Sequence, residues 1–321
     1  MRQIKLKNEY VSLTVLPEVG GLITSLKYVP KGIELLYKHR EPRPFYEWRE
    51  DYPRLDGVHS FFTGGWFEVL PNAGYATEYA GEKWGLHGET PYLPWEVELN
   101  GREENTIGLV VALRRYPLKL ARKISLENNN IVFKEVIYNL APVELYFSWL
   151  HHPTFGGEFV DEHLRLEIEP VEFVVDRELG LKYSELDLGY RGIWPYAKTR
   201  DDRMLDLRTY PKRGLNNTND LIYLPRVRDG IFKLTNDALG LTFEAHWDPK
   251  VFPTLWIWRA LGGGPEGPWY GTIYATSVEI TTSWPATGLA DQVSGGTAAK
   301  IGPNQSISTE LRFAIMEGGR R

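Results

Sequence analysis

Short runs in which apolar and polar residues alternate recur along this 321-residue chain, and no segment keeps an apolar stripe at helical spacing for three turns. Residues 10–16 and 22–28 form two such runs on either side of Gly20 and Gly21, which predicts a β-hairpin. Many short runs, with 31 Gly and 21 Pro to form the turns between them, predict an all-β protein built as a large antiparallel β-sandwich. Further strands are expected at 95–99, 106–113, 121–127, 131–139, 145–150, 164–170, 232–235, 241–246, 254–258, 271–278 and 306–315.

The chain carries no marked internal boundary. Because it has no Ser/Pro-rich linker, no abrupt change of composition and no internal repeat, we expect residues 1–321 to form one domain. Short helical turns are expected at 201–207 and 289–295, and the glycine-rich segment 64–74 is expected to be a loop rather than a buried strand. The glycine run 262–264 lacks the lysine and the helix start of a phosphate-binding loop, so it is expected to be a plain loop.

Composition excludes several classes of function. A net charge of −5 and a pI near 5.9, with basic residues scattered along the chain, argue against nucleic-acid binding. The absence of cysteine excludes disulfides and thiolate chemistry. The first residues, Met1 to Lys7, contain no apolar signal region, and no stretch approaches the about 18 apolar residues of a membrane span. We therefore expect a soluble, cytoplasmic protein with no membrane partner.

Three short motifs place ionisable side chains in sequence that otherwise consists of strands and turns. His87 lies in a glycine-rich segment, and Glu279 follows an apolar strand where burial would raise its basicity. His151 and His152 close another apolar run, and because neighbouring strand residues face opposite sides, only one of them is expected to face a given pocket. We expect this to be His152, next to a proline at the strand end. Two imidazoles and one carboxylate around one pocket could take a proton from one oxygen and give one to another.

Each of these residues also has a structural alternative. His87 could be a solvated loop histidine, His152 a hydrogen-bonded core histidine, and Glu279 the partner of an arginine at the rim. A metal site made of these three side chains is a further alternative, although no histidine or cysteine spacing typical of zinc is present. No nucleophile elbow, P-loop or dinucleotide motif occurs either, so we expect no metal and no cofactor.

The order of these motifs resembles that of the aldose 1-epimerase (galactose mutarotase-like) family, and the resemblance covers most of the chain. No motif is diagnostic alone, whereas several in the right order are fairly specific. The resemblance rests on the hairpin at 17–26, Leu86-His87-Gly88 followed by Trp95, His152-Pro153-Thr154-Phe155, Asp220-Leu221-Ile222-Tyr223, Val278-Glu279-Ile280-Thr281-Thr282, and the closing strands from 288 to 311.

The resemblance implies a galactose mutarotase-like supersandwich that interconverts the α- and β-anomers of an aldose without a cofactor. Glu279 would take the proton from the anomeric hydroxyl and His152 would protonate the ring oxygen, so that the ring opens, C1 rotates and the ring closes again. His87 would hydrogen-bond near the ring oxygen. The expected partner is a small-molecule sugar, and the expected assembly is a monomer or a homodimer. Substrate contacts are expected from Asp220, Asn72, Trp95, His151 and Glu89.

The chain departs from the family pattern where an arginine usually follows an asparagine, because Ala73 and Gly74 follow Asn72 here. The identity of the sugar is therefore open. One alternative is a hexose-phosphate epimerase, which would need arginines near the pocket. The others are a carbohydrate-binding protein that has lost catalysis, and a glycoside hydrolase or lyase with Asp220 as its second carboxylate. The arginines considered for a phosphate are Arg40, Arg43, Arg54, Arg114 and Arg115.

Overall fold

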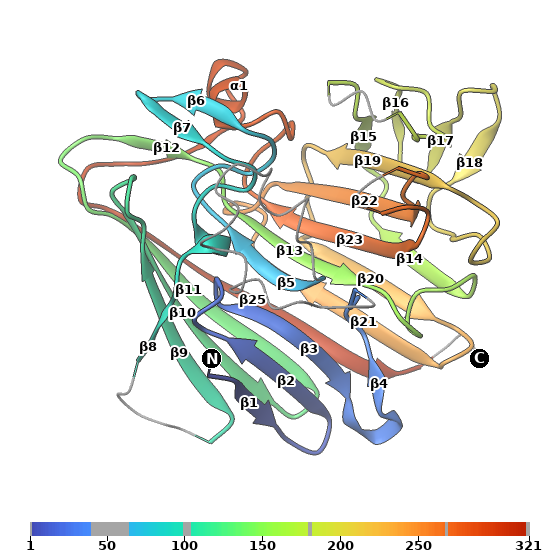
Figure 1. The fold of residues 1–321 in the computed structure, drawn as a ribbon, viewed down its shortest axis with the longest axis horizontal. Coiled ribbons are helices and arrows are strands. Elements are labelled where there is room, and N and C mark those ends of the chain that lie inside the picture. The colour runs from blue at the N-terminus through green and yellow to red at the C-terminus, as the bar shows by residue number, and fades with distance from the viewer. Residues whose placement is uncertain (1, 40–63, 99–103, 179–181, 267–268, 319–321) are drawn as a thin grey trace.

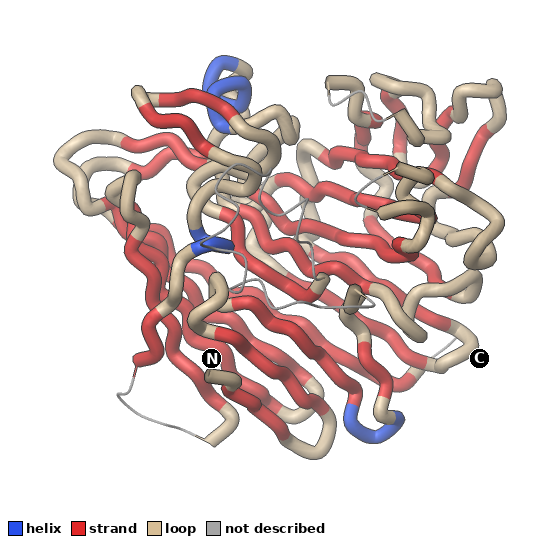
Figure 2. Tube along the Cα trace, viewed as in Figure 1, coloured by secondary structure: helices blue, strands red, loops and turns tan. Residues whose placement is uncertain are grey.

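Two large antiparallel sheets pack face to face and make up most of the protein (Figure 1). The computed structural model describes residues 2–39, 64–98, 104–178, 182–266 and 269–318. Strands and loops account for nearly all of these residues, with very little helix (Figure 2). The prediction of an all-β fold built as a large antiparallel β-sandwich is confirmed.

The larger sheet has eleven strands within the described residues, and neighbouring strands in it run antiparallel. It holds the predicted N-terminal hairpin at one end. In spatial order its strands are β1 (Ile4–Lys7), β2 (Val11–Leu16), β3 (Leu22–Tyr28), β5 (Gly65–Val69), β13 (Leu150–Phe155), β23 (Ile273–Thr281), β22 (Thr254–Gly262), β19 (Thr218–Leu224), β15 (Glu172–Val175) and β16 (Arg191–Ile193), with β4 (Ile33–Glu34) paired to β3.

The smaller sheet has eight strands in the same described part of the chain. Their order is β14 (Leu164–Ile168), β20 (Ile231–Asn236), β21 (Leu241–His246), β25 (Ser306–Glu317), β11 (Asn130–Asn139), β10 (Leu118–Glu127), β9 (Thr106–Ala112) and β8 (Glu96–Glu98). Short ribbons and helical turns complete the fold: β6 (Thr77–Tyr79) with β7 (Glu82–Trp84), β12 (Leu145–Phe147) with β24 (Ala299–Ile301), β17 (Tyr196–Lys198) with β18 (Met204–Asp206), η1 (Val29–Lys31), η4 (Thr90–Tyr92) and α1 (Leu289–Ser294).

The central strands of the larger sheet are buried on both faces. On one face, Trp66 of β5 packs against Phe133 and Phe313 of the smaller sheet, with ring centroids 5.0 and 4.6 Å apart. On the other face, Phe67 of β5 and Trp256 of β22 belong to a second apolar cluster. Strands buried on both sides carry continuous apolar runs rather than alternating ones. This explains why β5 and β23 are buried along their whole length.

Two-sided burial also accounts for two errors of the sequence interpretation, at β5 and β19. The segment 64–74, expected to be a loop, contains the buried strand β5, and β19 was not predicted as a strand. The expected strand 145–150 is divided between β12 and β13, so that His152 lies within a strand rather than at its end. The helical turn expected at 289–295 is present as α1, whereas 201–207 holds the strand β18 instead.

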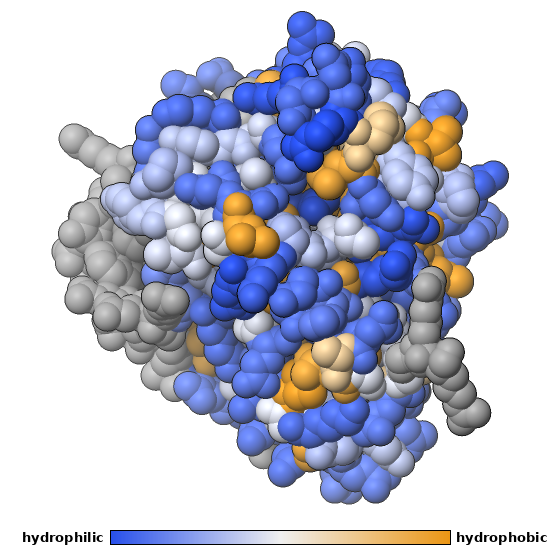
Figure 3. All heavy atoms as spheres, turned by 90° about the vertical axis from the view of Figure 1, so that its right-hand side faces the viewer, coloured by the Kyte–Doolittle hydropathy of each residue, from blue (hydrophilic) through white to orange (hydrophobic). Residues whose placement is uncertain are grey.

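The outer surface gives no sign of a large apolar contact area on the side drawn in Figure 3. Hydrophilic residues cover most of the coloured part of that face, and the hydrophobic ones are scattered between them. Single exposed hydrophobic residues of this kind are normal for a protein in water. Among the described residues, no helix combines the length and the apolar character needed to cross a membrane.

Candidate active site

His152 and Glu279 face each other from β13 and β23, which are neighbouring strands near the centre of the larger sheet. Figure 1 shows these two strands side by side. The register pairs Leu150 with Thr281 and Thr154 with Ser277, which places His152 of β13 opposite Glu279 of β23 on one face. His152 Nε2 lies 3.4 Å from Glu279 Oε1, and both residues are buried. A potential acid and a potential base therefore meet away from bulk water.

The ring of His152 is held by its neighbours on the same face. Phe67 of β5 pairs directly with His152, and the two rings stack at a centroid distance of 4.5 Å with an interplanar angle of 20°. His152 Nδ1 lies 3.3 Å from Thr154 Oγ1, and the half-buried Trp258 meets the imidazole edge-on at 6.2 Å. Because contacts reach both ring nitrogens and one ring face, the Nε2 atom stays directed toward Glu279.

Glu279 has the properties of a base that acts near neutral pH. Burial raises the pKa of Glu279 to about 8, and a hydrogen bond from Ser277 opposes this rise without cancelling it. A carboxyl group in water has a pKa near 4, so the desolvated carboxylate binds a proton much more strongly. At pH 7 the facing pair of Glu279 and His152 therefore holds at least one proton.

His87 reaches the same place from a loop. Its backbone has a φ of 60°, in the left-handed region, and Gly88 follows with a φ of 68°. This turn buries the imidazole 5.5 Å from the ring of His152 and 5.9 Å from Phe67. His87 Nδ1 accepts a hydrogen bond from the Gly74 N–H at 3.3 Å, so a neutral His87 carries its proton on Nε2. The solvated loop histidine considered as an alternative is excluded by this burial.

Asp220 does not lie with this group, which contradicts its predicted contact with the substrate. Its neighbours Asn219 and Leu221 share the face of Glu279, because Leu221 pairs with Trp258 and Trp258 with Ser277. Alternation therefore puts Asp220 on the opposite face. There its Oδ1 accepts hydrogen bonds from the Ser184 hydroxyl at 2.7 Å and from the backbone that follows Ser184. It can serve neither as a sugar ligand beside Glu279 nor as a second hydrolytic carboxylate.

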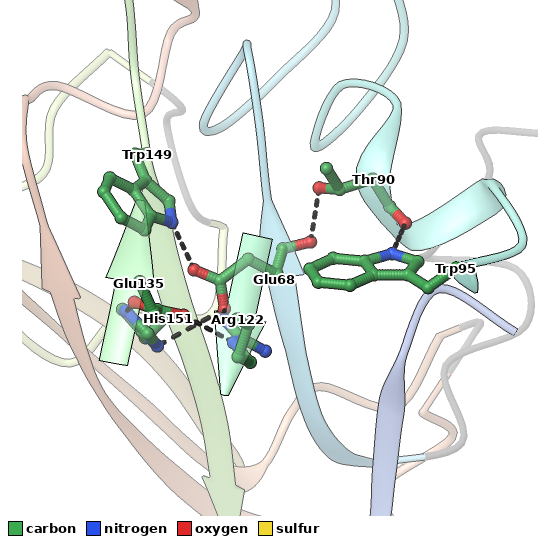
Figure 4. A network of polar contacts seen from close by, with 7 residues as sticks. All are labelled: Glu68, Thr90, Trp95, Arg122, Glu135, Trp149 and His151. Atoms are coloured by element: carbon green, nitrogen blue, oxygen red, sulfur yellow. Dashed lines mark hydrogen bonds and ion pairs between the residues drawn. The ribbon is translucent and has the colours of Figure 1, made fainter. Parts of the chain in front are cut away.

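His151 also points away from the site, into a buried network of charges between the two sheets (Figure 4). Its Nδ1 lies 3.3 Å from Glu68 Oε2 and its Nε2 lies 3.1 Å from Glu135 Oε2. Arg122 bridges both carboxylates, and Trp149 donates its indole N–H to Glu68. The prediction that only one histidine of the pair faces the site holds, but the expected sugar contact of His151 does not.

The buried network is also the one group among the described residues whose geometry could hold a metal ion, through Glu68, Glu135 and His151. Arg122 already compensates the negative charges of Glu68 and Glu135, as a metal ion would. Burial alone would lower the pKa of Arg122, but Glu135 and Glu68 outweigh it and raise the pKa above its usual value. A guanidinium held charged in contact with both carboxylates repels a cation. The group therefore fits an internal ion network better than a metal site.

Asn72 and Glu89 organise loops. The Asn72 amide donates to the backbone oxygen of Gly85 at 3.1 Å, and its Oδ1 accepts from the Leu289 N–H at 2.7 Å. Glu89 Oε1 accepts from Arg115 Nε at 2.8 Å, and its carboxylate also binds the Arg114 N–H. These contacts join distant segments and leave little hydrogen-bonding capacity for a sugar.

Trp95 is a core residue, because its indole N–H donates to the Thr90 carbonyl at 3.2 Å and its ring is buried. Asn72, Glu89 and Trp95 thus have structural contacts within the protein, and their expected contacts with a sugar stay predictions. Of the arginines considered for a phosphate, Arg115 is paired with Glu89, and Arg114 is exposed on the same turn. Arg40, Arg43 and Arg54 lie outside the described residues.

Phe67, Trp258 and Asn219 belong to the site and were not predicted. Asn219 Oδ1 accepts from the indole N–H of Trp258 at 2.6 Å, on the face shared with Glu279. Strand alternation through residues 218–224 could have selected Asn219 over Asp220, had β19 been recognised. Phe67 was hidden in the glycine-rich segment read as a loop.

Solved structures with the same fold were found over nearly the whole chain, whereas no family model and no curated protein matches the sequence. The galactose mutarotase related enzyme from Lactobacillus acidophilus gives a TM-score of 0.67 at 13% identity, covering 100% of this chain and 99% of that chain. This chain has the galactose mutarotase-like fold. The aldose epimerase homologue from C. elegans gives 0.65 at 13% identity, with 99% of each chain covered. The Slr1438 protein from Synechocystis sp. PCC 6803 gives 0.70 at 18% identity, covering 98% and 96%.

These comparisons concern the fold alone, because identities of 12–18% carry no information about a particular substrate. The fold expected from the order of motifs is confirmed. The function of the site depends on its own residues.

Proposed function

We propose that this protein is an aldose 1-epimerase, which interconverts the α- and β-anomers of a sugar by acid–base ring opening and closure. The observation that carries the proposal is the buried pair of His152 and Glu279, 3.4 Å apart on one face of the sheet. The fold, shared with aldose epimerase and galactose mutarotase homologues, supports it.

The chemistry needs an acid and a base close together. The anomeric hydroxyl and the ring oxygen are both bonded to C1, so one group must remove a proton while the other donates one a few ångströms away. Glu279 takes the hydroxyl proton as the C1–O5 bond breaks, and His152 protonates O5. The open aldehyde rotates about C1–C2, and closure with the roles reversed gives either anomer.

Two features of the site suit this reaction. The two proton-transfer groups should have similar proton affinities, and the pKa of about 8 at Glu279 lies close to that of an imidazole. The protonated Nε2 of a neutral His87 can in addition stabilise negative charge that develops on O5.

A carbohydrate-binding protein without catalysis is the rival function, because the same three side chains can hydrogen-bond a sugar. The raised pKa of Glu279 favours the enzyme, since a desolvated carboxyl group is a costly way to bind a neutral hydroxyl. The hexose-phosphate alternative lacks support, because the described candidates Arg114 and Arg115 lie on an outer turn with Glu89.

The proposal is tested by magnetisation-exchange NMR or polarimetry on fresh α-glucose, α-galactose and other aldoses. Wild-type protein should equilibrate at least one of them faster than buffer, and Glu279→Gln and His152→Ala should each lower kcat by at least about 10², as expected for lost acid–base catalysis. His246→Ala is the control, because His246 is a partly exposed histidine on β21 of the smaller sheet. If sugars bind but anomer exchange is not accelerated for any aldose, the epimerase proposal fails and the protein is a carbohydrate-binding protein.

A further inference from the structure

A pocket of about 610 Å³ lies beside the candidate active site, and nothing in the reaction proposed above uses it. Its walls come from β15 and the residues that follow it, from the start of β16, and from the segment 284–297. Pockets for small molecules measure about 300–1,000 Å³, so its size suits one. We call it the outer pocket, and its lining includes Asp176, Arg177, Arg191, Tyr223, Trp284 and Thr287.

One row of cross-strand neighbours connects the outer pocket to the acid–base pair. Glu279 lies opposite Trp256, and Trp256 lies opposite Tyr223. Tyr223 lies opposite Val174, and Val174 lies opposite Arg191. Strands are spaced by about 4.8 Å, so Tyr223 is about 10 Å from Glu279 along the row and Arg191 about 19 Å. The outer pocket thus begins about two strand spacings from the proposed site of reaction.

An aromatic ridge separates the two places. The segment after β23 crosses over the row, because the Trp256 indole donates to the Ser283 carbonyl at 2.9 Å and the Ala286 N–H donates to Tyr223 Oη at 3.1 Å. Trp284 on this segment is half-buried, packs against the apolar cluster of the site face, and lines the outer pocket. A ligand that spans both places would lie across this ring.

The polar groups of the outer pocket are those that bind hydroxyl groups. Asp176 is buried, and its Oδ1 accepts a hydrogen bond from the Tyr223 hydroxyl at 2.6 Å, which fixes the carboxylate. Thr287 Oγ1 is buried and has no hydrogen-bond partner among the described residues. Neither Arg177 nor Arg191 has an ion pair with any described residue, so both guanidinium groups keep donors for a ligand.

The charge of the outer pocket favours a neutral ligand. Asp176, Glu178 and Asp291 stand against Arg177 and Arg191, so the lining carries three negative charges and two positive ones. A phosphate or carboxylate would meet net repulsion. Carboxylates and guanidinium groups next to aromatic rings instead suit a sugar, which offers hydroxyl groups that both donate and accept and an apolar ring face.

We infer that the outer pocket binds the non-reducing residue of a reducing disaccharide whose reducing-end ring lies against His152 and Glu279. This rests on the proposed function, because only a reducing end has an anomeric centre to interconvert. The aromatic ring of Trp284 supports the glycosidic linkage between the two sugar residues, and Arg191 and Arg177 donate hydrogen bonds to the non-reducing sugar residue. The substrate class is therefore a short oligosaccharide rather than a free hexose.

The test compares glucose with maltose, cellobiose, laminaribiose, gentiobiose and lactose, all of which have glucose at the reducing end. At least one disaccharide should show a kcat/KM for anomer exchange at least about tenfold above that of glucose, the effect of one charge-assisted hydrogen bond. The double variant Arg177→Ala/Arg191→Ala should bring that value down to the level of glucose and leave glucose itself unchanged. Arg312→Ala, an exposed arginine on the smaller sheet, is the matched control.

Binding separates this inference from the proposed function. Titration calorimetry on the Glu279→Gln variant should detect the same disaccharide, with Kd raised about tenfold when Arg177 and Arg191 are also replaced. If no sugar is turned over but this binding pattern holds, the epimerase proposal fails and the pocket assignment stands. If glucose is turned over and no disaccharide is preferred or bound more tightly, the pocket assignment is overturned. Binding of inorganic phosphate that depends on Arg191 would also overturn it.

Discussion

Replacing Glu279 by glutamine should stabilise the protein, and increasingly so as the pH rises. The buried carboxyl group has a pKa of about 8, raised by desolvation, whereas an unfolded glutamate has a pKa near 4.5. Between these two values the folded protein keeps a proton that the unfolded chain releases. Folding stability that is fully present below pH 4.5 is therefore lost as the pH rises to 8. Glutamine has no proton to lose, so the variant escapes this loss.

The size of the effect follows from the two pKa values. They differ by about 3.5 units, and each unit is worth about 1.4 kcal/mol, so the full loss is about 5 kcal/mol. Part of it has already occurred at pH 5. From pH 5 to pH 9 the difference in free energy of unfolding between Glu279→Gln and the wild type should therefore increase by about 4 kcal/mol in favour of the variant. For a domain with a stability of about 5–15 kcal/mol, this is a large change.

Urea unfolding followed by tryptophan fluorescence at 25 °C, from pH 5 to pH 9, measures this difference directly. Glu96→Gln on the exposed part of β8 controls for the loss of one negative charge, and its curve should run parallel to that of the wild type. Parallel curves for Glu279→Gln and the wild type would show that the carboxyl group is already ionised at pH 5. Burial would then not make Glu279 a strong base.

Three further predictions concern other parts of the molecule. In wild-type enzyme, kcat/KM should fall as the pH rises through about 8, because the pair loses the proton that its acid member must donate; a flat profile up to pH 10 in the exchange assay would contradict this. Arg122→Met should cost about 3–5 kcal/mol of unfolding free energy, because Glu68 and Glu135 lose the guanidinium that compensates their buried charge. A triple variant with both glutamates also changed to glutamine should recover most of this loss in urea titrations. Gly74→Ala should lower Tm clearly more than Gly81→Ala: both glycines have positive φ, but a Cβ at 74 would lie 2.1 Å from the Ala286 oxygen while one at 81 meets nothing within 4 Å.

The fold could be predicted from the sequence because period 2 dominates it and no helical period competes. Strands exposed on one face, such as β9, β10 and β25, follow the expected ranges within a few residues. Strands buried on both faces were harder to predict from the sequence. In β5 the run Gly65–Val69 shows no alternation, since Trp66 faces the smaller sheet and Phe67 faces the site. Without alternation, the glycine content of the segment favoured a loop, and this prediction was wrong.

That His152, Glu279 and His87 lie close together could be predicted, whereas the faces on which Asp220 and His151 lie could not. His152, Glu279 and His87 converge because ionisable side chains in apolar sequence need a reason to be there, and one shared site supplies it. The ligand predictions at Asp220 and His151 failed by one strand position each. A shift of one residue moves a side chain to the opposite face of a sheet, so such predictions require the register, which no motif contains.

The two faces of β5 and β13 explain why charges are buried on both sides of one sheet. His151 and Glu68 pair across these strands toward the smaller sheet, while their immediate neighbours His152 and Phe67 stack toward the site. Arg122 of β10 holds Glu68 of β5 and also pairs with Glu135 of β11, which in turn contacts His151 of β13. The network therefore ties both strands to the smaller sheet from behind, and the stacked pair rests on a fixed backbone. A buried ion network adds little net stability. Arrangements in which its charges lose their partners are strongly disfavoured, so the network fixes the geometry of the strands that carry it. Loss of Arg122 should therefore reduce kcat at temperatures where the variant is still fully folded, because the orientation of His152 depends on the same two strands.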